Sequence, residues 1–291
     1  MKIEKIGKNL MQKDYFKGCY FKCSNETQTI AFIPAFHRSD HRETASLQII
    51  MDDAAFNLPF DSLEFQEKPL SVRIGYSIFS EKGIRLNIRT DKLSIYGTLH
   101  FGKLSPLRYD IMGPFQFVPF MQCRHSVFSM GHRVDGQLTI NGQVYNFQNG
   151  MGYIEGDCGT SFPERYIWTQ CSFPSGSLML SVADIPLYSL HFTGIIGVVM
   201  LNGKEHRIAT YLGARMQHIG KNTVTVKQGE YTLTAKLLTK NAHPLLAPDH
   251  GNMNRTIHES ASCRASYRFS HKEKILCEFT SDRASFEFEY Q

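Results

Sequence analysis

Short stretches in which apolar and polar residues alternate with a period of two run through most of this chain, and no long stretch follows the 3.6-residue period of a helix. Two pairs of such stretches are joined by Asn-Gly, at Asn141-Gly142 and at Asn202-Gly203. Asn-Gly is typical of the type I′ turn, whose twist matches that of the two strands it connects. The alternation and the turns together predict an all-β protein built from antiparallel hairpins.

At 291 residues the chain is long enough for two domains of ordinary size. Roughly eight short strands in each half predict two lipocalin-like, calycin-type antiparallel β-barrels in tandem, over residues 1–160 and 161–291. The two Asn-Gly hairpins hint at an internal duplication, and residues 1–15 show a brief helical pattern. The clearest expected strands are Tyr20–Lys22, Thr29–Phe36, Ser46–Met51, Ile74–Phe79, Ile84–Ile88, Leu93–Leu99, Ser177–Ala183, Thr223–Lys227, Tyr231–Leu237 and Phe286–Tyr290.

Charge and composition exclude several classes of protein. The net charge of +5 is spread along the chain and is denser only at Lys2, Lys5, Lys8 and Lys13, which is typical of a solvated segment. No apolar signal segment follows this start, and the longest apolar run, Phe192–Leu201, is shorter than the about 20 residues of a membrane-spanning helix. Seven cysteines without a Cys-x-x-Cys pair do not indicate a disulfide framework. We expect a cytoplasmic protein with no nucleic-acid partner and no integral membrane segment.

The segment Leu104–Gln122 has a different composition, because Pro106, Pro114 and Pro119 alternate there with Phe and Met side chains. Proline cannot donate a hydrogen bond to a neighbouring strand, so a central strand is excluded. We expect an ordered apolar loop that either connects two elements or covers a cavity.

The densest group of polar and aromatic side chains lies in Gly152–Phe173, which holds the only tryptophan of the chain. The motif reads as two strands separated by a corner at 159–163. Because side chains alternate along a strand, each strand has one face with acidic, amide or aromatic side chains and one face without such groups. The chemical faces carry Tyr153, Glu155 and Asp157 on the first strand, and Tyr166, Trp168 and Gln170 on the second.

The paired acids of this motif have two interpretations. In a structural role, Asp157 would accept hydrogen bonds from the backbone of the turn and Glu155 would form a salt bridge with Arg165. In a chemical role, the two carboxyl groups would lie about 7 Å apart on one face, so that each raises the cost of ionising the other. An acid that keeps its proton near neutral pH in an apolar wall can protonate a ligand. Both interpretations stay open.

At these residues the chain resembles the tocopherol cyclase-like family, whose signature is a G-Y-x-E-x-D-W-G-x-x-F-P run followed by a Y-x-W-x-Q strand. Cys158 stands where plant members have tryptophan. The resemblance covers most of the chain and extends to two-barrel, lipocalin-like relatives including hydroxyneurosporene synthase-like proteins. The matching positions are Gly152, Tyr153, Glu155, Asp157, Gly159, Phe162, Pro163, Tyr166, Trp168 and Gln170, with further matches at 113–115, 119–121, His125, 129–130, 247–248, 251–253 and 257–260.

The resemblance implies two barrels and the cyclisation of a prenylated hydroquinone, in which an acid protonates an alkene and the phenol oxygen adds to the tertiary cation. It implies no cofactor, and we expect none. A barrel of about eight strands has an interior just wide enough for one small ligand, so we expect the site inside a barrel. The implied roles are Asp157 and Glu155 as catalytic acids, Tyr153, Tyr166 and Trp168 as rings facing the cation, and Gln170 or His125 as the hydrogen-bond partner of the phenol.

Two functions of different class follow. The first is a cofactor-independent cyclase or isomerase that acts on a long apolar, prenylated or quinone-type molecule. The second is a non-catalytic carrier of a lipid or quinone, which the aromatic composition and Cys158 favour and which would load its ligand by transient contact with a membrane. An apolar small molecule is the expected partner in both, and the oligomeric state stays open.

A second cluster, Leu246–Ser260, places Met253, Arg255 and Glu259 on one face of an expected strand. Arg255 would pair with Glu259 or bind a carboxylate or phosphate group of the ligand. The alternatives are a salt-bridged loop that closes a barrel, with Met253 as a core residue.

No metal site is expected from the spacing of the histidines. His37 and His41 have a ligand-like separation, but they lie in a polar stretch that reads as a solvated loop. His125 and His132 lie seven positions apart and would face opposite sides of a strand, so each reads as a single histidine with its own partners.

Overall fold

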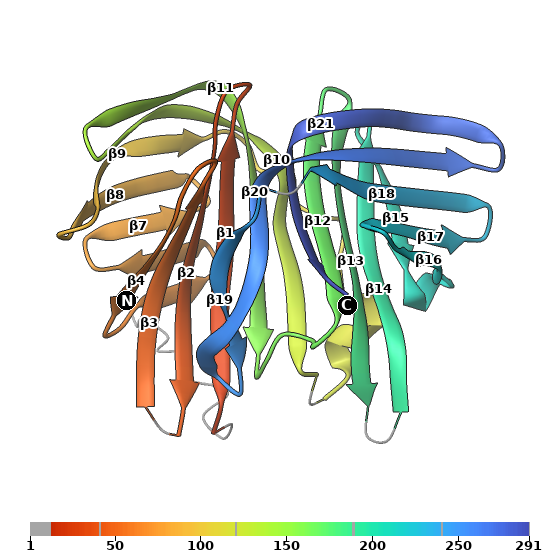
Figure 1. Ribbon diagram of the computed structural model, residues 1–291, viewed down its shortest axis with the longest axis horizontal. Helices are drawn as coiled ribbons and strands as arrows, with labels where there is room; N and C mark the ends of the chain where they lie inside the picture. The colour runs from red at the N-terminus through yellow and green to blue at the C-terminus, as the bar shows by residue number, and fades with distance from the viewer. Residues whose placement is uncertain (1–12, 41, 120, 188–189, 240, 291) are drawn as a thin grey trace.

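The computed structural model describes residues 13–290 except 41, 120, 188–189 and 240, so the predicted helix over residues 1–15 lies almost wholly outside the described residues. The described chain forms two curled antiparallel sheets that lie side by side (Figure 1). Each sheet wraps around its own apolar core. The prediction of an all-β fold with two lipocalin-like barrels in tandem is confirmed.

The first sheet holds eleven strands in the order β4-β3-β2-β1-β11-β10-β9-β8-β7-β6-β5. Its strands are β1 (Tyr15–Ser24), β2 (Thr29–Ser39), β3 (Arg42–Met51), β4 (Ala55–Phe60), β5 (Glu64–Glu67), β6 (Leu70–Ile74), β7 (Ser77–Ser80), β8 (Gly83–Arg89), β9 (Ser94–Phe101), β10 (Cys123–Ile140) and β11 (Gln143–Gly159). A short 3₁₀ helix, η1 (Gly113–Phe117), interrupts the segment between β9 and β10.

The second sheet holds ten strands in the order β15-β14-β13-β12-β21-β20-β18-β17-β16, with β19 paired to β20 off this path. Its strands are β12 (Tyr166–Phe173), β13 (Gly176–Leu187), β14 (Leu190–Leu201), β15 (Lys204–Ala209), β16 (Arg215–Gly220), β17 (Thr223–Gln228), β18 (Tyr231–Thr239), β19 (His243–Asp249), β20 (Asn252–His271) and β21 (Lys274–Glu289). A second 3₁₀ helix, η2 (Thr210–Leu212), follows β15. The chain passes from one sheet to the other between Gly159 and Tyr166.

The two sheets repeat the same strand order. In each, the first strand pairs with the last one, β1 with β11 and β12 with β21, and the remaining strands extend outward on both sides. The Asn-Gly hairpins are not equivalent in this repeat, because one joins β10 to β11 and the other joins β14 to β15. The structural repeat is therefore visible in the strand order and not in the hairpins.

Both hairpins themselves have the predicted geometry. Asn141 and Gly142 have φ of 50° and 85°, and Asn202 and Gly203 have φ of 51° and 75°. Two successive left-handed residues define a type I′ turn, which Asn and Gly adopt at low cost.

Two details of the strand prediction are wrong. The predicted strand Ile74–Phe79 is split into β6 and β7, because Gly75 adopts a φ of 55° and turns the chain. The two sheets also hold more strands than the roughly eight expected in each half, because β4, β5 and β16 carry weak alternation.

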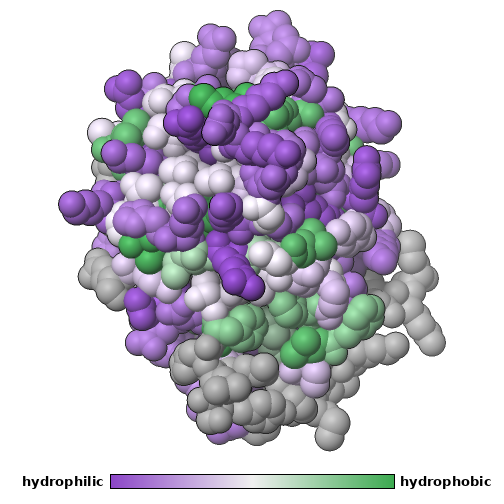
Figure 2. All heavy atoms as spheres, turned by 90° about the vertical axis from the view of Figure 1, so that its right-hand side faces the viewer, coloured by the Kyte–Doolittle hydropathy of each residue, from purple (hydrophilic) through white to green (hydrophobic). Residues whose placement is uncertain are grey.

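A third apolar cluster lies between the two sheets and includes Tyr20, Tyr153, Tyr166 and Trp168. Period-two alternation produces it, because the other face of the same strands fills the barrels; Ile154, for example, belongs to the core of the first. The outer side of the second sheet is mostly hydrophilic, with hydrophobic side chains in several groups, of which the widest lies low on the face (Figure 2). Among the described residues, no helix has the length and apolar character needed to cross a membrane.

Candidate active site between the barrels

A mainly apolar cavity lies between the two sheets. Its wall takes Tyr20, Glu155 and Asp157 from the first sheet and Trp168 and Glu259 from the second, while both barrel interiors are filled by packed side chains. The candidate site thus lies between the barrels, whereas a site inside a barrel was expected. The barrels meet through the faces opposite their cores, and those faces carry the chemical groups of the sequence motif.

The cavity is small and mainly apolar. Its volume is about 160 Å³. An engineered apolar cavity of roughly 150 Å³ binds benzene, so this space accepts a ring-sized group. The apolar part of the wall includes Phe16, Ile33, Met112, Phe115, Met121, Phe162, Ile185, Phe192, Leu245, Met253 and Ile257.

His125 lies between the two carboxyl groups of the motif. Its Nδ1 is 2.8 Å from Asp157 Oδ1, and its Nε2 is 3.1 Å from Glu155 Oε2 without the angles of a hydrogen bond. The register of β10 and β11 produces this arrangement, because His125 is directly opposite Asp157 and Val127 is opposite Glu155. The imidazole is thus held by both acids at the cavity wall.

We call His125, Asp157 and Glu155 the triad; its imidazole is protonated. Burial alone would lower the pKa of His125, but the negative charges of Asp157 and Glu155 outweigh burial and raise the pKa well above its usual value. His125 is therefore a buried cation at neutral pH, in contact with both carboxyl groups.

Glu155 joins the two halves of the motif. Its Oε2 accepts a hydrogen bond of 2.5 Å from the Tyr153 hydroxyl and one of 3.2 Å from the indole Nε1 of Trp168. Tyr20, opposite Glu155 in β1, places its ring 5.4 Å from Trp168, edge to face. Because Trp168 belongs to the second sheet, this acid links the two barrels.

Two further glutamates lie in the second sheet. Glu259 of β20 and Glu287 of β21 are directly opposite each other, both are buried, and both line the cavity. Glu287 accepts a short hydrogen bond from the Tyr166 hydroxyl. Burial raises the pKa of Glu259 to about 8 and, more than any other cause, also raises the pKa of Glu287 well above its usual value.

The segment 104–122 covers the cavity, which is one of its two predicted roles. Met112, Phe115 and Met121 line the space. Arg207 anchors the segment to the second sheet, since its guanidinium donates to the backbone oxygens of Tyr109 and, at 2.9 Å, Asp110.

The structure brings most of the predicted site residues together. Glu155, Asp157, Tyr166, Trp168, His125, Met253 and Glu259 all line the cavity. Three others stand back from it: Tyr153 is buried behind Glu155, Gln170 accepts a hydrogen bond from Lys22 at 3.1 Å, and Arg255 donates to the backbone oxygens of Pro163 and Glu164 at 2.7 and 2.6 Å.

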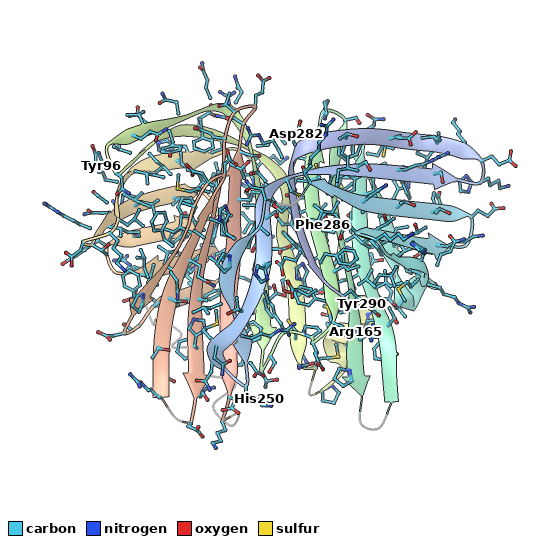
Figure 3. All side chains as sticks on the ribbon, in the orientation of Figure 1. Tyr96, Arg165, His250, Asp282, Phe286 and Tyr290 are labelled. Carbon is cyan, nitrogen blue, oxygen red and sulfur yellow. The ribbon has the colours of Figure 1, made fainter. Side chains whose placement is uncertain are left out.

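The predicted structural roles of the acids are not the ones observed. Arg165 forms an ion pair with Asp184 at 3.5 Å and stacks over Tyr290, beside which it lies in Figure 3, and it does not reach Glu155. Asp157 accepts hydrogen bonds from His125 and from the Cys123 thiol, and not from the turn. The predicted pairing of Arg255 with Glu259 is also absent from the ion pairs of the described residues.

The other histidines differ in outcome. His37 is not in a solvated loop: it is buried in β2, its Nε2 is 2.8 Å from Ser46 Oγ, and burial lowers its pKa to about 4. His41 lies outside the described residues. His132 has its own partner as predicted, with its Nδ1 3.0 Å from Ser129 Oγ.

His125, Glu155 and Asp157 also have the spacing of a metal site, since one ligand atom of each lies within 4.8 Å of the others. The two carboxyl groups, however, face different nitrogens of one ring, so a metal ion would have to break one of these contacts. A hydrogen bond to Asp157 and an ion-pair contact with Glu155 account for the observed arrangement.

Sequence reasoning missed Tyr20, Glu287 and His37 as cavity residues. Glu287 alternates with Phe286 and Phe288, and such alternation indicates a glutamate on the solvent side of a strand. Only the contact between the two sheets buries it. Among the cysteines, all seven are free, and burial raises the pKa of the Cys158 thiol, which is half-buried.

Fold and site together define a two-barrel, lipocalin-like protein with an acid-lined apolar cavity between its barrels. A model of the tocopherol cyclase-like family matches residues 92–288, so the chain belongs to this family. A search of curated protein sequences found no match.

Solved structures share the fold at low sequence identity. CghA has a TM-score of 0.59 at 8% identity, covering 96% of this chain and 89% of that one. Kievitone hydratase from Nectria haematococca has a TM-score of 0.53 at 10% identity, covering 97% and 90%. A putative AttH from Nitrosomonas europaea has a TM-score of 0.50 at 10% identity, covering 100% and 97%.

Proposed function

We propose that this protein binds an apolar molecule that carries a ring and an alkene between its two barrels, and adds an oxygen–hydrogen bond across the alkene by acid–base catalysis. The observation that carries the proposal is the triad of His125, Asp157 and Glu155 in the wall of an otherwise apolar cavity. A buried imidazolium flanked by two carboxylates is costly to maintain in an apolar protein wall, and such groups gather where protons are transferred.

The proposed chemistry is that of a cyclase. A proton adds to the alkene, the more substituted carbon becomes a cation, and a phenol oxygen of the same molecule attacks that carbon. Asp157 and Glu155 are the proton-handling acids, which act on either side of His125. The faces of Trp168 and Tyr166 stabilise the cation, by up to about 2 kcal/mol each in a dry site.

The size of the cavity limits how the ligand binds. The reacting ring fits, whereas a long prenyl chain needs further space. A larger open groove of about 630 Å³ adjoins the cavity, and His37, Leu246 and Met253 line both. We infer that the chain of the ligand passes these three residues into the groove, while its ring end lies beside the acids.

The test is incubation with geranylhydroquinone, followed by chromatography and mass spectrometry. Cyclisation gives a product of unchanged mass and different retention. Loss of this activity in each of the single variants Asp157→Asn and Glu155→Gln would support the proton-transfer roles of the two acids. Full activity in both variants would end the assignment of these acids. Intermolecular addition of water, as the name of kievitone hydratase suggests for that relative, would instead give a product heavier by one water.

The second candidate function is carriage without turnover, and the mainly apolar wall of the cavity favours it. Native mass spectrometry of freshly purified protein separates the two functions. A co-purifying apolar molecule that stays chemically unchanged supports carriage.

A further inference from the structure

Among the described glutamates that line the cavity, only Glu259 has a fully buried oxygen without a hydrogen-bond partner. Its Oε1 has no hydrogen-bond partner although the residue is only 2% exposed and lies on the cavity wall. Its neighbour Glu287 is engaged by the Tyr166 hydroxyl, and Glu155 by Tyr153 and Trp168. An unpartnered buried carboxyl oxygen costs free energy unless a ligand group meets it.

The charges around the cavity show where protons must reside. Four acids, Glu155, Asp157, Glu259 and Glu287, line the cavity together with His125, whose pKa is raised well above its usual value. The nearby buried Lys22, which donates to Gln170, has a pKa lowered to about 8. Two uncompensated negative charges would remain if all four acids were ionised, and isolated buried charges are strongly unfavourable. Burial raises the pKa of both Glu259 and Glu287, so we assign the protons to these two carboxyl groups.

We propose that Glu259 is the residue that donates the proton to the alkene, and that the triad of Asp157, His125 and Glu155 in the facing sheet receives the proton released by the adding hydroxyl. This inference rests on the proposed function and divides its two proton transfers between the two barrels. Glu287 lies directly opposite Glu259 on β21, and the charge of an ionised Glu259 would raise the pKa of Glu287.

The step balances in atoms and electrons. The proton leaves the Glu259 carboxyl, the π pair of the alkene forms the new C–H bond, and the more substituted carbon becomes the cation. The hydroxyl oxygen then forms the C–O bond with a lone pair, and its proton goes to the Asp157 carboxylate. Glu259 has lost one proton and Asp157 has gained one, so exchange with water after product release restores both.

The groups that face Glu259 agree with a donor. Burial has the largest effect on its pKa, the charge of Glu155 also raises it, and the hydrogen bond from Tyr20 and the charge of Lys22 act in the opposite direction. Glu287 of β21 and His243 of β19 are its cross-strand neighbours. The net result is a carboxylic acid that is protonated at neutral pH and ionises at a mildly alkaline one.

The first arm of the test needs no turnover. Infrared spectra at pH 7 are compared for the wild type, Glu259→Gln and the control Glu278→Gln, which changes an exposed glutamate of β21. Glu259→Gln keeps the shape and neutral charge of the protonated acid, so it is expected to fold. We expect the carbonyl band of protonated carboxylic acids to lose about half its intensity in Glu259→Gln only. An unchanged band would overturn the protonated state.

The second arm measures turnover of geranylhydroquinone against pH. In the wild type, kcat should fall above about pH 8. Glu259→Gln should lose about 100-fold or more in kcat while the Kd stays within about threefold, and Glu259→Asp should recover part of the rate. A purely structural role would not give this separation of kcat from Kd, nor the alkaline fall.

The two proposals fail in different ways. If the wild type and Glu259→Gln turn over at similar rates, Glu259 is not the donor and the proposed function stands. If the wild type leaves geranylhydroquinone unchanged although the infrared band is present, the proposed function is overturned, and the donor role with it.

Discussion

At the scale of single residues, the site depends on which face of a strand a side chain occupies. Tyr153, Glu155 and Asp157 were predicted to share a face, and the structure places them together against the second sheet. The sequence could not show that this face meets another barrel, because alternation gives the same pattern for a face in water. The neighbours of each acid, His125 and not Arg165, also depend on register across strands.

Asp157→Asn tests the triad directly. Removal of the nearer negative charge should lower the pKa of His125, because burial then outweighs the remaining carboxylate. We expect the imidazole to titrate at a lower pH in an NMR experiment and kcat to fall by about 100-fold. Asp282→Asn, which changes an exposed carboxylate, is the control. An unchanged titration of His125 would contradict the assignment.

The stability of the protein should depend on Glu259 in a defined pH range. Its pKa is raised from 4.5 to about 8 on folding, so the folded state binds more protons than the unfolded state between these values. The resulting stability is fully present below about pH 4.5 and is lost as the pH rises through about 8. Each pKa unit corresponds to about 1.4 kcal/mol.

Denaturant unfolding of the wild type and Glu259→Gln from pH 5 to 9 measures this effect. His37 and His132, with lowered pKa values, and His125, with a raised one, also change stability with pH, but they do so in both proteins. The difference between the two curves therefore isolates Glu259. We expect Glu259→Gln to become the more stable protein toward pH 9; parallel curves would disprove the raised pKa.

At the scale of elements, two connections shape the site. The covering segment 104–122 was predicted from its prolines, whereas its anchor was not, because Arg207 lies about 100 residues away in sequence. The corner after β11 was predicted from its glycine and proline. Its function as the crossing from one sheet to the other was not evident, because a corner within one sheet has a similar sequence.

Arg207→Ala should release the covering segment. Its guanidinium is largely buried against the backbone oxygens of Tyr109 and Asp110, which would lose their donors. We expect faster hydrogen exchange in residues 108–115 and faster ligand dissociation, by about tenfold. Arg264→Ala, in an exposed ion pair, serves as the control. Equal exchange in both variants would show that the anchor is not needed.

Gly159→Ala should be more destabilising than an ordinary substitution of a glycine. Gly159 has a φ of 158°, and an added Cβ would lie 2.1 Å from the backbone oxygen of Gln122. The matched control Gly203→Ala has a φ of 75° but open space around the new Cβ. We expect a loss of about 1 kcal/mol in the control and about 3 kcal/mol in Gly159→Ala by thermal unfolding. Equal losses of stability in the two variants would mean that the backbone at 159–163 adjusts to the added Cβ without strain.

At the scale of the whole molecule, the fold was predictable and the position of the site was not. Alternation, the Asn-Gly turns and the family motif all indicate two barrels, and both barrels are present. The cavity, however, forms where the two sheets pack against each other, and no local sequence pattern indicates which residues make the contact between the sheets. Glu287 shows this most clearly, since only that contact changes it from a surface residue into a buried acid.

The central claim is that the ligand binds between the barrels, and the fluorescence of Trp168, the only tryptophan, reports on that space. The measurement is quenching by a prenylated benzoquinone in the wild type and in Ala183→Met, which fills the cavity from its wall. The account predicts saturable quenching in the wild type and a Kd weakened by at least about tenfold in Ala183→Met. Equal affinity in the two proteins would place the ligand elsewhere and contradict the account.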